Sequence, residues 1–149
     1  MQIRRMTLAD IPQVAVLEAQ NFTMPWSEKG FADALKQPEH IFLVAELEDK
    51  TLAAYCGLYA SGDEGEITNV AVSDQVRRQG IGQAVVAEVL RQAEYQGMRQ
   101  IFLEVRKTNT GARNLYEKLG FVNCGIRKNF YQKPCEDAVL MRKDLDETG

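Results

Sequence analysis

The chain has 149 residues, 45% of them hydrophobic and 26% charged, which suits one folded domain spanning residues 1–149. Its formal net charge of −3 argues against nucleic acid as the main partner, because surfaces that track phosphates are usually basic. No apolar run approaches the roughly 18 residues of a membrane span. The N-terminus also lacks a signal-peptide core, so we expect no membrane partner and a cytoplasmic location.

Metal and disulfide chemistry are also disfavoured. The three cysteines, Cys56, Cys124 and Cys135, are too few and too scattered for a disulfide framework. The single histidine, His40, has no close cysteine pair beside it, which leaves little for a zinc site. We therefore expect a protein without a metal in a reducing compartment.

The N-terminal half predicts a strand, two helices and three strands. Residues 1–6 form the first strand, and a helix opened by Thr7, Asp10 and Pro12 runs to about residue 21. Ser27 caps a short second helix that ends near residue 36. Strands at 41–48 and 51–60 form a hairpin, and another strand follows at 64–73.

The C-terminal half predicts helix, strand, helix and two more strands. Apolar residues four apart mark a helix over 81–97, which Gly97 can end. A buried strand follows at 99–107, a helix at 109–120, and strands at 121–131 and 136–145. The complete order, β-α-α-β-β-β-α-β-α-β-β, predicts an α/β protein whose central mixed sheet is flanked by helices on both faces.

The stretch QVRRQGIGQAV, residues 75–85, predicts an anion site at the start of the 81–97 helix. The first N–H groups of a helix lack partners, and its dipole is positive there. Gly80 and Gly82 let an anion approach the backbone, and Arg77 and Arg78 add charge. The alternative is a plain helix start with two solvated arginines. Val85 stands where a dinucleotide motif needs its third glycine, and no G-x-x-x-x-G-K-[ST] motif is present.

Three further residues allow both a structural and a chemical interpretation. Glu104 lies in the apolar strand IFLEVR, where a carboxylate is costly without solvent or a partner, so it either forms an ion pair with Arg106 or a lysine or acts in catalysis. Tyr116 is either a packed aromatic or a functional phenol. Asn109 is a candidate N-cap two helical turns before Tyr116.

The loop pattern [RQ]-x-x-G-x-[GA], preceded by NVAVS, resembles the GNAT superfamily of N-acetyltransferases, whose element order also matches. The resemblance implies acetyl-coenzyme A as cosubstrate. It assigns Val70, Ala71 and Val72 to the acetyl and pantetheine groups, with the Val72 N–H as oxyanion donor, and Asn109 to a cofactor contact. It also assigns the pyrophosphate to the loop residues Arg77, Arg78, Gln79, Gly80, Ile81, Gly82 and Gln83.

The segments LEVRKTNTGARNLYEKLGF and IRKNFYQKPCEDAVLM, together with PWS, resemble the bacterial ribosomal-protein-alanine N-acetyltransferases, although Phe130 stands where a tyrosine is common. This resemblance implies acetylation of the N-terminal amine of a small-subunit ribosomal protein, with Glu104 as proton acceptor and Tyr116 as proton donor. The rival base is Glu66, because EITNVAVS also resembles the histone-acetyltransferase branch, in which a glutamate at this offset is the base.

Two segments are candidates for acceptor binding: FTMPWS, with Trp26, and NFYQKPCED, with Tyr131. We expect direct transfer without an acyl-cysteine, because Cys56 lies in a core strand with no histidine near it in sequence. The sequence leaves open a small-molecule amine acetyltransferase of the same fold and a coenzyme-A-binding module without catalysis.

Overall fold

The computed structural model describes residues 1–22, 24–76 and 79–145. The strands are β1 Gln2–Arg5, β2 Ile41–Glu46, β3 Leu52–Ser61, β4 Glu64–Val72, β5 Gln100–Arg106, β6 Val122–Tyr131 and β7 Glu136–Asp144. The α-helices are α1 Ile11–Asn21, α2 Glu28–Leu35, α3 Ile81–Tyr95 and α4 Thr110–Lys118. The predicted order is confirmed, with two short 3-10 helices added, η1 Leu8–Asp10 and η2 Asp74–Val76.

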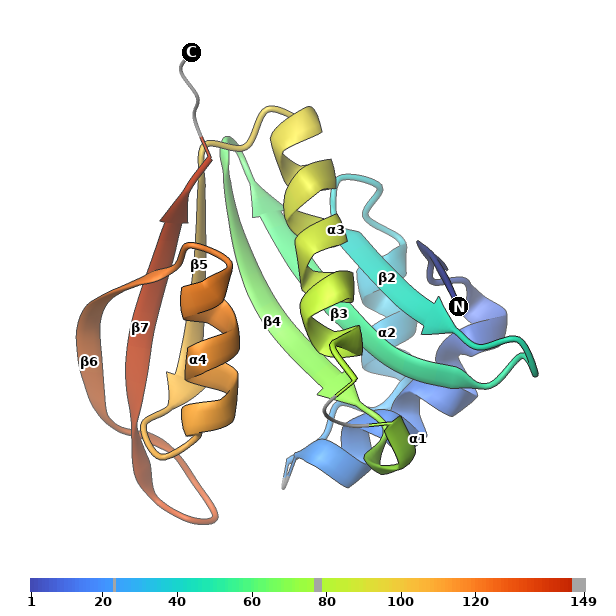
Figure 1. Cartoon of the computed structure of the whole chain (residues 1–149), viewed down its shortest axis with the longest axis horizontal. Helices are drawn as coiled ribbons and strands as arrows, with labels where there is room; N and C mark the ends of the chain where they lie inside the picture. The colour runs from blue at the N-terminus through green and yellow to red at the C-terminus, as the bar shows by residue number, and fades with distance from the viewer. Residues whose placement is uncertain (23, 77–78, 146–149) are drawn as a thin grey trace.

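All seven strands join one sheet in the order β1-β2-β3-β4-β5-β7-β6. The β4–β5 pair is parallel and the other five adjacent pairs are antiparallel. The mixed sheet expected from the sequence is therefore confirmed, and its single parallel pair lies next to its centre (Figure 1).

Helices cover both faces of the sheet, as predicted. Apolar residues of α1 and α2 form one buried cluster with β2 and β3. Apolar residues of α3 and α4 form a second, larger cluster on the opposite face. Strand β5 divides its side chains between the faces: Ile101, Leu103 and Val105 are buried in the α3–α4 cluster, so Glu104 and Arg106 project toward the other face.

A bulge in β4 interrupts the sheet at Thr68. Leu58 of β3 pairs with Ile67 and Gly57 pairs with Asn69, so Thr68 has no opposite residue. Before the bulge, Ile67 faces the α3–α4 cluster; after it, Ala71 is buried in the α1–α2 cluster. Because of this extra residue, odd-numbered side chains of β4 point to the α3–α4 face before the bulge and to the α1–α2 face after it.

Strands β4 and β5 stop pairing at this bulge. Their register runs from the pair Glu64–Gln100 to the pair Ile67–Leu103 and goes no further. Beyond that point the two strands diverge, as their lower ends show in Figure 1. The second half of β4 thus has β3 on one side and, within the described residues, no strand on the other.

Gly57, opposite the bulge, gives a test of this packing. A Cβ atom there would lie 2.4 Å from Cε2 of Phe42, whose ring is buried and cannot swing aside. Gly57→Ala should lower the free energy of unfolding by about 1–3 kcal/mol through overpacking, measured by urea denaturation.

Gly30→Ala is the matched control, because Gly30 lies in α2 and its nearest neighbour would be 3.6 Å from the new Cβ. It should be neutral or stabilising by about 0.5–1 kcal/mol. Equal stability of the Gly57→Ala variant and the unmodified protein would contradict the close approach of Gly57 to Phe42.

Candidate active site

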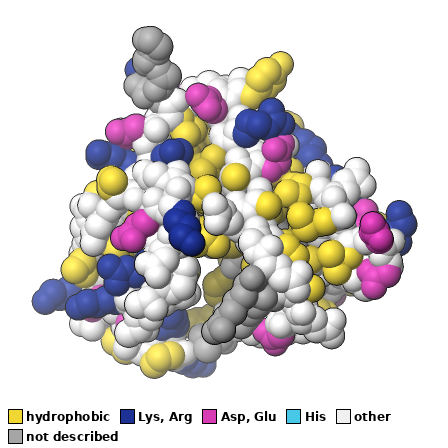
Figure 2. Space-filling model, in the orientation of Figure 1, with side chains coloured by type: hydrophobic (Ala, Val, Ile, Leu, Met, Phe, Trp, Pro, Cys, Tyr) yellow, Lys and Arg dark blue, Asp and Glu magenta, His cyan; other side chains and the backbone are white. Residues whose placement is uncertain are grey.

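A cleft of about 1060 Å³ lies where β4 and β5 diverge. Its walls come from the start of α3, the second halves of β4 and β5, helix α4, the loop between α1 and α2, and the β6–β7 turn. Figure 2 views the molecule from the side of α3 and α4 and shows a hollow in the lower half of that face. Segments far apart in sequence therefore share one cavity.

The start of α3 forms one end of the cleft. Gly80, Ile81, Gly82 and Gln83 all line it. Gly80 has a φ of 76°, in the left-handed region that glycine adopts without strain, and turns the chain into the helix. A Cβ atom on Gly82 would lie 3.1 Å from Cγ2 of Val72, so a side chain there would fill space beside the cavity. The first-turn N–H groups of α3 therefore lie at the cavity, where a helix start can bind an anion.

The remaining loop residues of the predicted anion site have different positions. Gln79 is exposed and does not line the cleft. Arg77 and Arg78 lie outside the described residues. Within the described residues, the part of the predicted anion site that borders the cleft is therefore the start of α3, residues 80–83.

The second half of β4 supplies a main-chain edge to the cleft. Val70 and Val72 line it, whereas the side chain of Ala71 is buried in the α1–α2 cluster. Because β4 no longer pairs with β5 here, an extended ligand can add to this edge as a strand does. Main-chain contacts from Val70, Ala71 and Val72 stay a prediction that this geometry favours.

Glu104 reaches the cleft from β5 and is ion-paired. Its Oε2 accepts a hydrogen bond of 2.8 Å from Nη1 of Arg127, and 16% of its side chain is exposed. The predicted ion pair of Glu104 with Arg106 or a lysine is therefore wrong, because its partner is Arg127. Arg127 of β6 reaches across β7 at Ala138, which pairs with both Arg127 and Arg106 and is small enough to leave room.

Arg106 instead braces the β6–β7 turn. It donates to the carbonyl oxygens of Gln132 and Pro134, both at 2.9 Å, and lies 3.3 Å from Oε1 of Glu136. Its guanidinium also lies over the ring of Tyr131, 4.5 Å from the centroid. Burial raises the pKa of Tyr131 to about 12, and the Glu104 carboxylate contributes to the rise.

Glu66, the rival base, lies outside the cleft lining. It is exposed on β4 before the bulge. Partial removal from water raises its pKa, the neighbouring Glu104 carboxylate raises it further, and Arg127 opposes both effects. Glu66 and Glu104 are therefore close enough to interact, but only Glu104 borders the cavity.

Tyr116 enters the cleft from α4, on the opposite face of β5 from Glu104. Its ring is 8% exposed and packs edge-to-face on Phe121, with the centroids 5.7 Å apart. Burial raises the pKa of its hydroxyl well above the ordinary value, so this group stays protonated at neutral pH. Both interpretations of Tyr116 are compatible with this position, since it packs in the core and borders the cavity.

Asn109 caps α4 and also borders the cleft. Its side chain accepts a hydrogen bond of 3.1 Å from the N–H of Ala112, which confirms the N-cap prediction. Its position in the lining is compatible with the predicted cofactor contact.

The two predicted acceptor segments line the same cleft. Phe22, Met24 and Trp26 contribute from the α1–α2 loop, and Phe130, Tyr131, Gln132 and Pro134 contribute from the β6–β7 turn. Both segments therefore border the same cavity as Glu104, and the α3 start lies on the face of the sheet that holds Tyr116.

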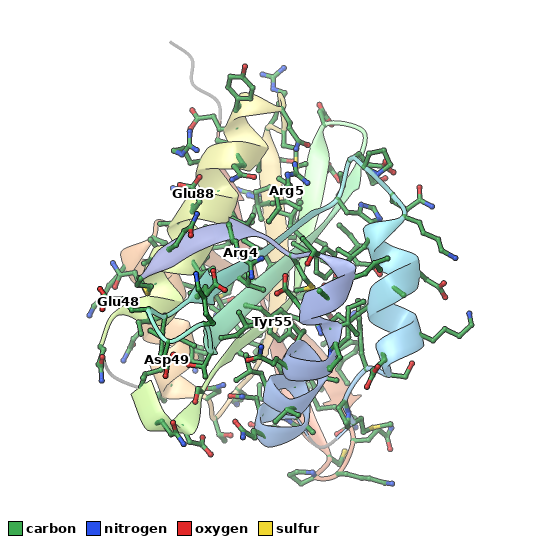
Figure 3. All side chains as sticks on the ribbon, turned by 90° about the vertical axis from the view of Figure 1, so that its right-hand side faces the viewer. Arg4, Arg5, Glu48, Asp49, Tyr55 and Glu88 are labelled. Carbon is green, nitrogen blue, oxygen red and sulfur yellow. The ribbon has the colours of Figure 1, made fainter. Side chains whose placement is uncertain are left out.

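Sequence analysis missed a buried polar cluster in the cleft wall. Glu18 of α1 accepts hydrogen bonds from the hydroxyl of Tyr55, the amide of Asn69 and the main-chain N–H of Trp26. Tyr55 points from β3 toward α1 (Figure 3). The available signal was Glu18 itself, which falls on the apolar face of its helix, four residues after Val14.

The groups that line this cleft can support acid–base chemistry beside the helix start that is predicted to bind an anion. Burial raises the pKa of Cys56 far above its ordinary value, so its thiol is a poor nucleophile. Across residues 1–22, 24–76 and 79–145, no group of three or more His, Cys, Asp or Glu side chains is arranged to hold a metal ion. In the same residues, no helix is both long and apolar enough to cross a membrane.

Comparison with known proteins gives a consistent result. The model of the acetyltransferase (GNAT) family matches residues 11–121. A putative [ribosomal protein bS18]-alanine N-acetyltransferase of Bacillus subtilis is 37% identical, covering 97% of this chain and 96% of its own length. The [ribosomal protein bS18]-alanine N-acetyltransferase of Escherichia coli is 33% identical, with 93% and 94% covered. A crystal structure of the ribosomal-protein-S18-alanine N-acetyltransferase from Escherichia coli superposes with a TM-score of 0.90, covering 99% of this chain and 96% of that one.

The brace at the β6–β7 turn predicts an acid-labile contribution to stability. Hydrogen bonds from Thr108, followed by Arg106, hold the pKa of Glu136 below its ordinary value of 4.5. A lowered folded-state pKa stabilises the fold above the unfolded-state value, and this stabilisation is lost as pH falls through the folded-state pKa. Glu136→Gln should therefore lower Tm at pH 7, and this deficit should shrink as the pH falls from 7 toward 3, through the lowered pKa of Glu136.

Glu117→Gln, on the exposed face of α4, is the control and should leave Tm nearly unchanged at both pH values. Thermal unfolding followed by circular dichroism measures all three proteins. A Tm difference for Glu136→Gln that stays constant from pH 7 to pH 3 would exclude this carboxylate as the titrating group.

Proposed function

The chain belongs to the GNAT acetyltransferase family, and we propose that it transfers the acetyl group of acetyl-coenzyme A to the N-terminal α-amine of a protein. The proposed acceptor is a small-subunit ribosomal protein that begins with alanine, because the relatives above are named for that reaction. A single domain spanning residues 1–149 would carry both substrate sites. The proposed location is the cytoplasm, where acetyl-coenzyme A and new ribosomal proteins meet.

One observation carries this proposal: a single cleft joins a glycine-rich helix start to a carboxylate. Gly80 and Gly82 border it at one end, and Glu104 borders it between two aromatic loop segments. The helix start suits the pyrophosphate of the cosubstrate, with the arginines of the same loop as proposed partners. The open edge of β4 suits its pantetheine arm, which leads the thioester toward Glu104.

Glu104 is the proposed proton acceptor. An α-amine must be neutral to attack the thioester carbonyl, and its ordinary pKa of roughly 7.7–8.0 makes deprotonation easier than for lysine at about 10.4. The Glu104 carboxylate takes the proton, directly or through one water. Arg127, whose side chain is 55% exposed, can turn toward solvent when the ammonium group of the acceptor approaches.

Tyr116 is the proposed proton donor. As the C–S bond breaks, the departing thiolate takes the phenolic proton, and burial favours a protonated phenol until that moment. Glu104 projects from β5 on one face of the sheet, Tyr116 projects from α4 on the other face, and both border the cleft. Transfer is then direct, in a ternary complex, with the N–H of Val72 as the proposed oxyanion donor.

The anion site predicts a specific loss of cosubstrate affinity. Gly82→Asp places a negative side chain at the first turn of α3, beside Val72. Calorimetry should show acetyl-coenzyme A binding weakened by about tenfold or more, which is at least ~1.4 kcal/mol. Circular dichroism should show the fold retained.

Gly30→Asp is the matched control, because it makes the same change in the first turn of α2, outside the cleft. Its affinity for acetyl-coenzyme A should match that of the unmodified protein. Unchanged affinity in a folded Gly82→Asp variant would remove the α3 start from the binding site.

The acceptor prediction uses two peptides of the same composition. One begins with a free alanine and should be acetylated once, at its first residue, as read by mass spectrometry. The other is blocked at its N-terminus and carries an internal lysine, which should be nearly inert because of its higher amine pKa. Equal rates on the two peptides would reject α-amine specificity, and a polyamine that outcompetes both would favour the small-molecule alternative.

The roles of Glu104 and Tyr116 predict different pH responses. Glu104→Gln should lower kcat by about 10²–10⁴-fold, and part of the loss should return at higher pH, where more of the acceptor amine is already neutral. Tyr116→Phe should lower kcat without that recovery and leave the affinity for acetyl-coenzyme A nearly unchanged.

Glu66→Gln is the comparison that decides between the two bases. It should cost much less than Glu104→Gln, because Glu66 does not border the cleft. A severe loss in Glu66→Gln together with a mild one in Glu104→Gln would reverse the assignment.

A further inference from the structure

Glu18 is a buried carboxylate that the proposed chemistry does not use. Its residue is 2% exposed, and it lies on the inner face of α1 with Val14 and Leu17. Removing a carboxylate from water costs several kcal/mol unless hydrogen bonds compensate for the lost hydration. The partners of this carboxylate therefore explain how the fold tolerates it.

Three donors from three different elements surround the Glu18 carboxylate. Oε1 accepts from the hydroxyl of Tyr55 on β3 and from Nδ2 of Asn69 on β4, the latter at 3.3 Å. Oε2 accepts from the main-chain N–H of Trp26 at 3.0 Å and from the same Asn69 nitrogen at 3.2 Å. Each oxygen of the carboxylate therefore accepts from two contacts, and Asn69 Nδ2 is shared between the two oxygens. Glu18 thus binds protein groups from three segments of the chain.

Two of the three donors belong to different segments of the cleft wall. Asn69 directly follows the bulge at Thr68, where β4 parts from β5. Trp26 lies in the α1–α2 loop, and its ring packs on Phe31 with the centroids 5.2 Å apart. Trp26, Asn69 and Glu18 all line the cavity.

The orientation of Asn69 depends on Glu18. Its Nδ2 faces the carboxylate, and its Oδ1 is buried with no hydrogen-bond partner elsewhere in the described chain. An amide turned the other way would place its oxygen against the carboxylate, so the charge of Glu18 selects the conformer. The hydrogen bonds of Glu18 thus determine the conformation of the β4 wall.

A buried carboxylate is a poor source of stability, because an apolar residue of similar size often stabilises a fold equally well. What it supplies here is a fixed geometry between α1, the α1–α2 loop and the bulge. We propose that Glu18 is a positioning residue for acetyl transfer, whose carboxylate holds Trp26 on the acceptor side of the cleft and Asn69 at the bulge, and so sets where the acceptor amine meets the thioester. This inference rests on the proposed function.

The test compares Glu18→Gln with a matched core variant. A glutamine amide keeps the shape and one acceptor oxygen but replaces the other oxygen with an NH2 donor, so it cannot accept from Trp26 on one side and from Tyr55 on the other at once, and part of the tether is lost. The acceptor KM should rise and kcat fall, with kcat/KM reduced about 10- to 100-fold, as expected for a small misplacement of a reacting group. The Kd for acetyl-coenzyme A should stay within about twofold, because the α3 start is untouched. Val89→Ala, which is buried on the opposite face, should leave the acceptor KM unchanged.

The chain offers an independent spectroscopic signal, because Trp26 is its single tryptophan. In Glu18→Gln the Trp26 emission should shift to longer wavelength, and acrylamide should quench it more strongly. Val89→Ala should show neither change. Tyr55→Phe removes one donor and leaves the other two, so it should show a smaller fluorescence change, and it decides the question if Glu18→Gln does not fold.

Three outcomes would overturn the proposal: unchanged Trp26 quenching and acceptor KM in folded Glu18→Gln, equal changes in Val89→Ala, or acceptor and cosubstrate affinities that weaken together. Failure of the unmodified protein to acetylate any α-amine peptide would instead reject the proposed function. In that case the comparison of Trp26 quenching between Glu18→Gln and Val89→Ala alone decides whether Glu18 holds the α1–α2 loop.

Discussion

The loss of pairing between β4 and β5 is the feature on which the rest of the structure depends. The two strands are parallel partners for four residue pairs, and the bulge at Thr68 then ends the ladder. Beyond it, β4 has no strand beside it on the β5 side within the described residues, and the sheet has a gap through which groups from its two faces can meet. Without that gap, Glu104 and Tyr116 would be separated by the sheet and could not take their proposed roles at one bond.

Keeping a sheet open has a cost, because the main-chain hydrogen bonds that a neighbouring strand would supply are lost. Two charged clusters hold the opening on either side. Glu18 ties α1, the α1–α2 loop and the bulge together. Arg106 and Glu136 tie the end of β5 to the β6–β7 turn. The walls of the cleft are thus held by hydrogen bonds to charged groups, which are stronger than those between neutral groups.

Tyr116, Cys56 and Glu104 lie in different environments, and these differences suit different proposed roles. Tyr116 is buried in the α3–α4 cluster, which raises its pKa and keeps its proton available. Cys56, buried in the same cluster, is kept as an unreactive thiol by the same effect. The Glu104 side chain keeps 16% of its surface exposed beside Arg127, which suits its proposed role as proton acceptor. The two faces of the sheet therefore give the proposed donor and the proposed acceptor different environments.

The sequence by itself determined the elements and many residues of the candidate site. Apolar periodicity, Ser27, Asn109 and Gly97 located the helices and strands, because these signals act within a few residues of the chain. Local motifs also brought Gly80, Gly82, Glu104 and Tyr116 into consideration, and all four border the cleft. Their proximity to one another was not visible in the sequence, because they come from three separate elements.

Only the tertiary structure decided the bulge at Thr68, the partner of Glu104 and the role of Glu18. The bulge depends on the register of β3 against β4, and the stretch around Thr68 carries no sequence mark of it. Arg127 reaches Glu104 across β7, which lies between β5 and β6, because Ala138 leaves space there. Glu18 is held by donors 8, 37 and 51 residues away. Contacts of that range depend on how the elements pack, and periodicity along the chain carries no information about them.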